Sequence, residues 1–145
     1  MIETALESLR MSPRFRDRIA HIEVLPAREP RFGELGVPLS AGIAHYLNSR
    51  HIRLYSHQCQ AVEALRAGRN VILCTPTASG KTLGFDLPVF ETLEGDRQAT
   101  ALFVYPTKAL SNDQLKVFKD MERATGIRAD AAVYDGDTPV SRRRR

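Results

Sequence analysis

The chain begins with apolar residues at helical spacing, but this helical periodicity ends after the first residues. Ile2, Leu6 and Leu9 recur at intervals of three or four residues and predict a short amphipathic helix at the N-terminus. Prolines and glycines interrupt every later apolar run as far as residue 38, which indicates an irregular segment that wraps over its neighbours. Residues 1–39 are therefore expected to form an N-terminal extension, and residues 40–145 a regular body.

Helical and strand patterns alternate along this body. Four segments have apolar residues on one helical face, and each follows a capping residue or precedes a glycine. The first of these predicted helices begins after Ser40, and the other three span about 57–67, 81–94 and 107–123. Short apolar runs between them are typical of buried strands, and they lie at 70–74, 99–105 and 129–134.

Strands that alternate with helices in this order predict an α/β fold with a parallel sheet and right-handed crossovers. Three strands are fewer than a finished sheet of this kind needs, because a parallel sheet is covered on both faces. We therefore expect an incomplete domain, with an open sheet edge after Val133.

Composition narrows the class of protein without pointing to a partner. The chain has 145 residues, of which 43% are hydrophobic and 26% charged, as in globular proteins. No apolar run approaches the roughly 20 residues of a membrane span, and the acidic N-terminus does not resemble a signal peptide. The formal net charge of +4 equals the contribution of the four arginines at 142–145, so the body is balanced. A cytoplasmic protein with no membrane partner is expected, and its two cysteines are expected to be buried.

The loop between the first predicted strand and the next helix carries the clearest chemical signal. Residues 75–82 read T-P-T-A-S-G-K-T, and Gly80, Lys81 and Thr82 match the end of the phosphate-binding loop G-x-x-x-x-G-K-[ST], although Thr75 replaces its first glycine. In such loops backbone N–H groups converge on phosphates, the lysine neutralises them, and the hydroxyl binds Mg²⁺. The loop therefore predicts a site for ATP and Mg²⁺ rather than a turn with an exposed lysine.

The departure at the first glycine makes this loop resemble motif I of superfamily 2 helicases of the DEAD/DEAH-box type, [A/T]-x-T-G-S-G-K-T. Three further segments are similar to motifs of that family and occur in its order. The segment L-Y-S-H-Q, ending at Gln58, resembles the Q motif, and Y-P-T-K-A-L at 105–110 resembles motif Ia. The string Y-D-G-D-T-P at 134–139 falls where the next nucleic-acid motif, Ib, is expected.

The Y-D-G-D-T-P string, the loop variant and the N-terminal P-R-F-R-D-R-I-A-H-I-E-V-L-P-A-R-E stretch resemble the bacterial Hrq and mitomycin-repair helicases most closely. This resemblance implies a P-loop NTPase fold of the RecA type, ATP-driven work on DNA, and a role in DNA repair. It also implies that the chain holds only the N-terminal part of the first of two RecA-like domains, with the rest of the helicase chain as its partner.

Individual roles follow from the resemblance residue by residue. Lys81 and Thr82 are the implied catalytic residues, and Thr82 is the implied Mg²⁺ ligand. The implied ATP-binding residues are Tyr55, Gln58, Thr77, Ala78, Ser79, Gly80, Lys81 and Thr82. Gln58 would pair with the adenine edge. The implied contacts to nucleic acid, with a single DNA strand favoured, are Pro106, Thr107, Lys108, Asp137 and Thr138.

Several of these residues have a simpler local interpretation. Tyr55 either stacks on the base or packs under the Q-motif helix. Thr107 caps a helix whether or not it contacts phosphate. Asp135 and Asp137 are also typical of a turn after a strand, and carboxylates repel a DNA backbone.

The reaction also needs groups that the sequence does not supply. Phosphoryl transfer uses a carboxylate pair after a strand and an arginine finger. The only D-x-E string, from Asp120 to Glu122, lies in mid-helix. We therefore expect the chain to bind ATP without turning it over. An RNA helicase of the same superfamily and an inert nucleotide-binding module remain as alternatives, whereas the Gln58 and P-T-K-A-L matches argue against a P-loop kinase.

Overall fold

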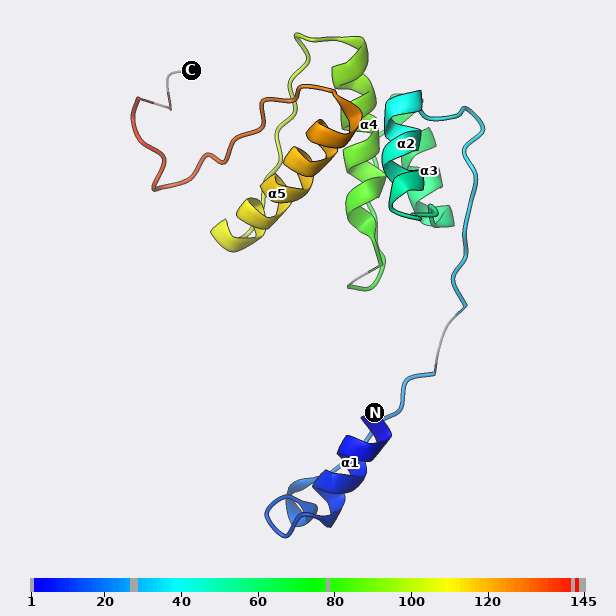
Figure 1. Ribbon diagram of the computed structural model, residues 1–145, viewed down its shortest axis with the longest axis vertical. Coiled ribbons are helices and arrows are strands. Elements are labelled where there is room, and N and C mark those ends of the chain that lie inside the picture. The colour runs from blue at the N-terminus through cyan, green and yellow to red at the C-terminus, as the bar shows by residue number, and fades with distance from the viewer. Residues whose placement is uncertain (1, 27–28, 78, 142, 144–145) are drawn as a thin grey trace.

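A computed structural model describes residues 2–26, 29–77, 79–141 and 143 (Figure 1). Its secondary structure is helical. The elements in chain order are α1 (Ile2–Met11), the short 3-10 helix η1 (Arg16–Arg18), α2 (Ala41–Ser49), α3 (Ser56–Arg66), α4 (Lys81–Gly95) and α5 (Lys108–Thr125). The helices predicted from periodicity are therefore confirmed, with boundaries that differ by one or two residues. No helix in this described part of the chain is both long and apolar enough to cross a membrane.

The ends of these helices follow local sequence, with one exception. The Thr107 hydroxyl accepts a hydrogen bond from the Leu110 N–H at 3.2 Å and so caps α5, which ends at Gly126 in the left-handed conformation. Ser40 occupies the N-cap position of α2, but its buried hydroxyl has no partner among the described residues. The prediction that Ser40 is the N-cap residue of this helix is therefore confirmed in position, although its side chain forms no capping hydrogen bond.

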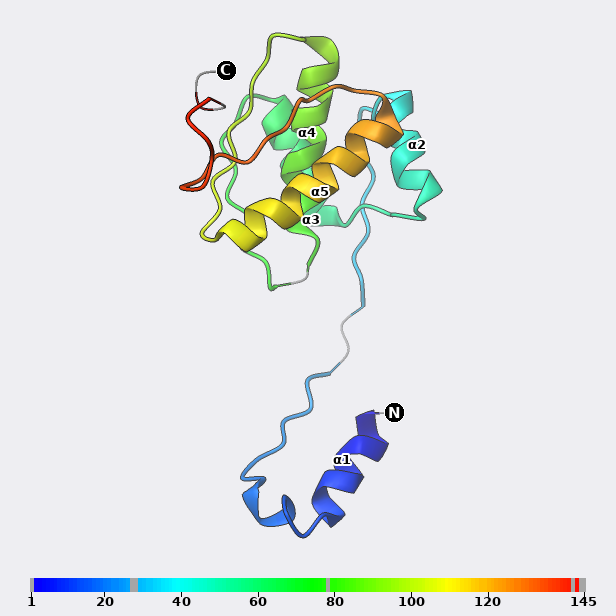
Figure 2. The same ribbon diagram turned by 60° about the vertical axis from the view of Figure 1, so that its left-hand side comes forward.

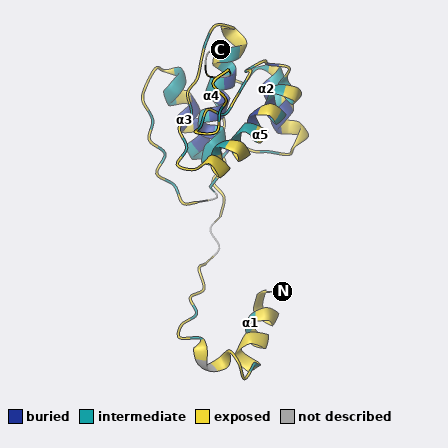
Figure 3. Cartoon of the chain, turned by 90° about the vertical axis from the view of Figure 1, so that its left-hand side faces the viewer, coloured by how far each residue is buried: buried dark blue, intermediate teal, exposed yellow. Residues whose placement is uncertain are grey.

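The hydrophobic core lies where helices α2 to α5 meet (Figure 3). Helix α3 packs against α4, and α2 packs against α5. Phe90 of α4 and Phe118 of α5 meet at this centre, with ring centroids 5.2 Å apart. The buried apolar side chains are Ile43, Tyr46, Leu47, Leu54, Cys59, Ala61, Val62, Leu87, Phe90, Phe118, Met121 and Ile127. None of the residues of α1 is buried.

The parallel sheet is not confirmed. Residues 70–74, 99–105 and 129–134 belong to no helix or strand, and within the described residues the only bridge joins Phe32 to Tyr55. Figure 2 shows the three segments running past α4 and α5 without arrows. Their apolar character was predicted correctly, whereas the backbone pairing that would make them strands is absent from the described structure.

Side chains of these three segments nevertheless alternate as they would in a sheet. Phe103 and Ala131 pack against the core, and Leu73 reaches Gly84 of α4. The intervening residues face outward, and the most exposed of them are Ile72 at 89%, Leu102 at 89%, Val104 at 85% and Tyr134 at 72%. The segments therefore present a covered face and a bare apolar face. Cys74 lies on the bare side, so the prediction that both cysteines are buried was wrong for Cys74.

The end of the N-terminal extension is hydrogen-bonded to α3 and to the residues just before it. The Ser56 N–H donates to the Arg31 carbonyl at 2.8 Å, and the Gly33 N–H donates to the Leu54 carbonyl at 3.0 Å. Further along, the Arg66 guanidinium donates to the Val37 carbonyl at 2.6 Å. This part of the extension wraps over the body as the prolines and glycines predicted. The boundary between 1–39 and 40–145 stays a prediction.

Candidate nucleotide-binding and nucleic-acid-binding site

The phosphate-loop sequence forms a tight connection into α4. Gly80 precedes the first residue of the helix and has φ +74°, a left-handed conformation that favours glycine. The Thr75 and Ser79 hydroxyls lie 2.6 Å apart and share a hydrogen bond across the loop. Because the first N–H groups of a helix have no intrahelical acceptors, this end of α4 presents donors and a positive partial charge to an anion.

Lys81 folds back over this loop. Its ammonium nitrogen lies 2.7 Å from the Thr75 carbonyl oxygen, 2.5 Å from the Pro76 carbonyl oxygen and 3.3 Å from the Ser79 hydroxyl. The Lys81 ammonium group therefore already lies against the loop, where the motif requires a positive charge. Phosphate oxygens are stronger partners for an ammonium group than neutral carbonyls, so the residues present fit a polyphosphate.

Gln58 joins the Q-motif helix to the phosphate loop. Its side chain is 2% exposed. The amide oxygen accepts the Tyr55 N–H at 2.7 Å, and the amide nitrogen donates to the Gly80 carbonyl at 2.5 Å. An amide oxygen has a second lone pair and an amide nitrogen a second hydrogen, so each end keeps capacity for one more partner. A side chain 22 positions before Gly80 thus fixes the start of α4.

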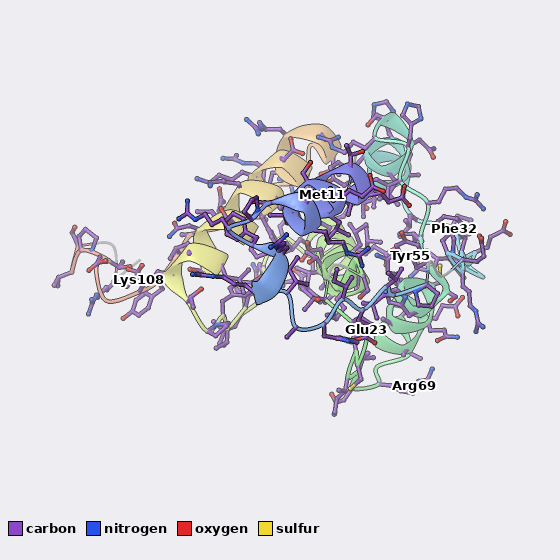
Figure 4. The ribbon with its side chains drawn as sticks, turned by 90° about the horizontal axis from the view of Figure 1, so that it is seen from below. Met11, Glu23, Phe32, Tyr55, Arg69 and Lys108 are labelled. Carbon is purple, nitrogen blue, oxygen red and sulfur yellow. The ribbon has the colours of Figure 1, made fainter. Side chains whose placement is uncertain are left out.

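An aromatic stack beside Gly80 was missed by the sequence analysis. The rings of Phe32 and Tyr55 are stacked with centroids 5.3 Å apart, and His57 continues the stack 5.7 Å from Tyr55. The Arg53 guanidinium lies 4.1 Å from the centre of the Phe32 ring. Figure 4 shows Phe32 and Tyr55 on the same side of the molecule. Phe32 stands alone among prolines and glycines, and only the fold brings it to the Q motif.

Tyr55 also lies against the phosphate loop. A Cβ atom built on Gly80 would come within 3.7 Å of the Tyr55 ring and 2.8 Å of the Gln58 amide nitrogen. The two Q-motif side chains therefore converge on the backbone of one glycine. This arrangement places an aromatic ring and the buried, hydrogen-bonded Gln58 amide next to the helix end that follows the phosphate loop.

Thr82 and Asp86 lie one turn apart on α4. Thr82 is half-buried in the first turn, at the position that the motif assigns to the Mg²⁺ ligand. Asp86 is fully buried, and neither carboxyl oxygen has a hydrogen-bond partner among the described residues. Burial raises the pKa of Asp86 to about 7. Asp86 was not among the predicted site residues, although it is the one charge in the apolar run from Leu83 to Phe90.

The residues implied to contact nucleic acid gather at the start of α5. Pro106, Thr107 and Lys108 are exposed there, and the Lys108 ammonium forms an ion pair with the Asp137 carboxylate. This hydrogen bond raises the pKa of Lys108. The fold thus brings together residues 29 positions apart that the motifs had assigned to one surface. It also neutralises the cation that would meet a phosphate.

Thr138 serves the turn that carries Asp137. The Thr138 hydroxyl accepts the Asp135 N–H at 2.8 Å, and the Asp135 carboxylate accepts the Asp137 N–H at 2.9 Å. These bonds are those of a turn stabilised by its own side chains, as the local interpretation of Asp135 and Asp137 predicted. The Thr138 hydroxyl is therefore engaged within the turn in this structure.

The mid-helix acidic pair is structural. Asp120 forms ion pairs with Arg50, the residue directly after α2, and with Arg123 of α5. Glu122 accepts the backbone N–H groups of Ala129 and Asp130 at 2.6 and 2.8 Å. None of these contacts of the two carboxylates involves a residue of the phosphate loop.

The two halves of the implied site lie apart from each other. The structure brings Tyr55, Gln58, Ser79, Gly80 and Lys81 together around the start of α4, with Thr82 in its first turn. Thr77 is exposed in the loop, and Ala78 lies outside the described residues. Lys108 is far from Tyr55 in the view of Figure 4. A nucleotide and a nucleic-acid strand would therefore occupy separate surfaces.

Comparison with known proteins finds similarity to helicases. The sequence profile of the family described as DEAD/DEAH box helicase matches residues 55–145. The chain is 37% identical to "ATP-dependent helicase hrq1" of Schizosaccharomyces pombe over 98% of its own length and 14% of that protein. It is 32% identical to "Uncharacterized ATP-dependent helicase YprA" of Bacillus subtilis over 95% of its length and 19% of that protein.

Solved structures give the same result. The crystal structure of the DUF1998 helicase MrfA bound to DNA and AMPPNP superposes with a TM-score of 0.75 at 36% identity, over 80% of this chain and 16% of that one. The chain thus spans less than a fifth of the relatives it matches. The motifs, the profile match and these relatives together show that the chain belongs to the DEAD/DEAH box helicase family.

Proposed function

We propose that this chain is the ATP-binding and single-strand-binding N-terminal portion of an ATP-dependent DNA helicase that acts in DNA repair in the cytoplasm. The observation that carries the proposal is the contact of Gln58 with Gly80 while Lys81 closes over the loop. This contact joins the Q motif and the phosphate loop at one helix end. The relatives named as helicases, and the MrfA structure bound to DNA and AMPPNP, support the same function.

In this proposal the chain's own residues divide the nucleotide between them. Lys81 exchanges its loop carbonyls for the β- and γ-phosphates, and the backbone N–H groups of Ser79 and Gly80 bind phosphate oxygens as well. Thr82 holds Mg²⁺, which would supply charge neutralisation at the phosphates. The remaining hydrogen and lone pair of Gln58 pair with the adenine edge, and Tyr55 presents its ring to the base.

The strand-binding half of the proposal rests on the start of α5. Thr107 and Lys108 stand at a helix N-terminus, where anions are favoured, and Pro106 leaves the approach to this end exposed. The turn at 135–138 supplies Asp137 and Thr138 next to them. DNA is the proposed strand because MrfA was solved with DNA. The rest of a helicase chain would supply a carboxylate pair and an arginine finger.

Thermal unfolding tests the nucleotide site. Ligand that binds only the folded chain stabilises it by about 2.7 kcal/mol at a free concentration of 100 Kd. Mg-ATP at millimolar concentration is therefore expected to raise the melting temperature of the wild-type chain, and Lys81→Ala is expected to abolish the rise. Lys116→Ala, which removes an equal charge from the exposed surface of α5, is the control and retains it. The same rise in Lys81→Ala would refute the phosphate assignment.

A further inference from the structure

Thr75 is a residue of the phosphate loop to which the proposed function gives no role. It replaces the first glycine of the general loop pattern, and its side chain is half-buried. Its hydroxyl oxygen lies 2.6 Å from the Ser79 hydroxyl oxygen, so a hydroxyl bridge joins two residues four positions apart. A glycine at position 75 has no side chain and could not form this bridge.

The hydroxyl bridge is connected to Lys81 through both of its residues. The Lys81 ammonium donates to the Ser79 hydroxyl oxygen at 3.3 Å and to the Thr75 carbonyl oxygen at 2.7 Å. A hydroxyl oxygen has two lone pairs and one hydrogen, so Ser79 can accept from Lys81 and still pair with Thr75, whichever hydroxyl is the donor. These groups therefore form a closed ring of hydrogen bonds within the loop.

The hydroxyl bridge differs from the other contacts of the loop in its relation to the nucleotide. Of the described hydrogen bonds that side chains of the loop make within residues 75–81, it is the one that does not involve Lys81. In the proposed function Lys81 leaves its carbonyl acceptors for phosphate oxygens. The hydroxyl bridge then remains as the contact that restrains the loop.

A loop that is restrained before binding gains affinity. A segment that becomes ordered on binding loses conformational entropy at that step, and a contact that already exists in the free chain reduces the loss. Glycine has more backbone freedom than any other residue. The general pattern therefore has a flexible residue at the position where this chain has a threonine held by a hydrogen bond.

We propose that the hydroxyl bridge holds the phosphate loop in the shape that receives a nucleoside triphosphate, which makes Thr75 a positioning residue of the site. Thr75 acts through Ser79 and the loop backbone, and its hydroxyl, which is engaged with Ser79, does not bind phosphate. This inference rests on the proposed function for its ligand, whereas the bridge itself belongs to the free chain.

Three variants separate the hydroxyl bridge from the other effects of a threonine. Thr75→Val removes the hydroxyl and keeps the branched shape, and Thr75→Ser keeps the hydroxyl. Thr92→Val is the matched control, because the Thr92 hydroxyl also forms one hydrogen bond, to the Pro88 carbonyl at 2.8 Å. Thr92 is exposed near the C-terminal end of α4, so its loss leaves the loop intact.

Calorimetric titration of the whole chain with Mg-AMPPNP measures the effect on affinity. The contribution of one hydrogen bond corresponds to a change of about two- to tenfold in Kd, so Thr75→Val should raise the Kd by that factor. Thr75→Ser and Thr92→Val should each stay within about twofold of the wild type. The melting temperature without nucleotide should fall no further in Thr75→Val than in Thr92→Val. An unchanged Kd in Thr75→Val overturns the proposal.

A double-variant cycle tests whether the two hydroxyls act as one unit. Ser79→Ala should weaken Mg-AMPPNP binding at least as much as Thr75→Val, because the Ser79 hydroxyl also contacts Lys81. In the Ser79→Ala background Thr75→Val should add no further loss, whereas losses that add overturn the proposal. A wild-type chain that does not bind Mg-AMPPNP would refute the proposed function, and this inference with it, so the two failures are distinguishable.

Discussion

At the scale of single residues, two buried polar side chains near the phosphate loop differ in their hydrogen bonding: Gln58 has partners, and Asp86 has none among the described residues. Gln58 is as buried as the core but has a partner at each end of its amide, so its burial costs little. Asp86 has the same burial without a partner, and its pKa rises to about 7 because the charged form is desolvated. A group of this kind makes the stability of the folded chain depend on pH.

Asp86→Asn is expected to change that dependence. Asp86 keeps its proton to about pH 7 when folded, whereas an unfolded aspartate loses it near 3.9, so the folded state binds more protons between these values. Its contribution to stability therefore falls as pH rises from about 4 to 7 and is level above 7. The advantage of Asp86→Asn over the wild type should grow across that window, towards roughly 4 kcal/mol at most. Urea unfolding at several pH values measures this difference, and a constant difference contradicts the assignment.

The ion pair of Lys108 with Asp137 gives a second residue-scale prediction. Both side chains are mostly exposed, so the pair is weak in the free chain, but Asp137 places a negative charge where a phosphate would approach. Asp137→Asn is expected to raise the affinity for a single-stranded oligonucleotide about two- to fivefold at low salt.

The effect of Asp137→Asn should shrink with added salt and disappear in a Lys108→Ala background. Asp113→Asn removes a matched exposed partner, that of Lys116 on the same helix, and should change affinity less. Weaker binding by Asp137→Asn would show instead that the Asp137 carboxylate itself takes part in the contact to the strand. Fluorescence anisotropy over a salt series distinguishes these outcomes.

At the scale of elements, the site depends on how closely α3 and α4 approach. Gly84 makes that approach possible, because a Cβ atom there would lie 3.0 Å from the end of the Leu73 side chain and 3.4 Å from the Ala61 Cβ. Gln58 is on the same face of α3, with its Cα 3.7 Å from that point. The packing of two helices therefore sets the contact between Gln58 and Gly80.

Gly84→Val is expected to separate these helices. Overpacking of this size costs about 1–3 kcal/mol, so the melting temperature should fall. Mg-ATP affinity should fall with it because Gln58 no longer holds the start of α4. Gly95→Val is the control, since Gly95 ends the same helix and a Cβ atom added there would meet nothing within 4 Å, and it should leave Mg-ATP affinity unchanged. Wild-type melting and affinity in Gly84→Val would contradict this account of the packing.

The elements also show what sequence can and cannot predict here. Helices were predictable because their signals are local, as in the Thr107 cap and the Gly126 end of α5. The phosphate loop was predictable because its residues are contiguous. The position of Phe32 and the ion pair of Asp137 with Lys108 were not predictable in this way, because the contacts with Tyr55 and Lys108 join residues 23 and 29 positions apart. Strand pairing depends on similarly distant partners, so apolar runs predicted extended segments without fixing a ladder.

At the scale of the whole molecule, the segments at 70–74, 99–105 and 129–134 leave one side of the body uncovered. Phe103 packs inward, with its ring centroid 4.9 Å from that of Phe118, while its neighbours Leu102 and Val104 are 89% and 85% exposed. Ile72, on another segment, is 89% exposed. Exposed apolar surface of this kind promotes association, because burying it is favourable.

The isolated chain of 145 residues is therefore expected to self-associate through this bare face. Replacing Leu102 and Val104 together by lysine should keep the chain monomeric to higher concentration, because two charges cannot be buried between copies without partners. The melting temperature should change little, since both side chains already face solvent. Phe103→Lys is the opposite control: it inserts a charge against Phe118 and Phe85 and should unfold the chain rather than disperse it. Sedimentation velocity at increasing protein concentration measures the association. Equal association of the wild type and the Leu102→Lys/Val104→Lys variant would show that copies meet through another surface.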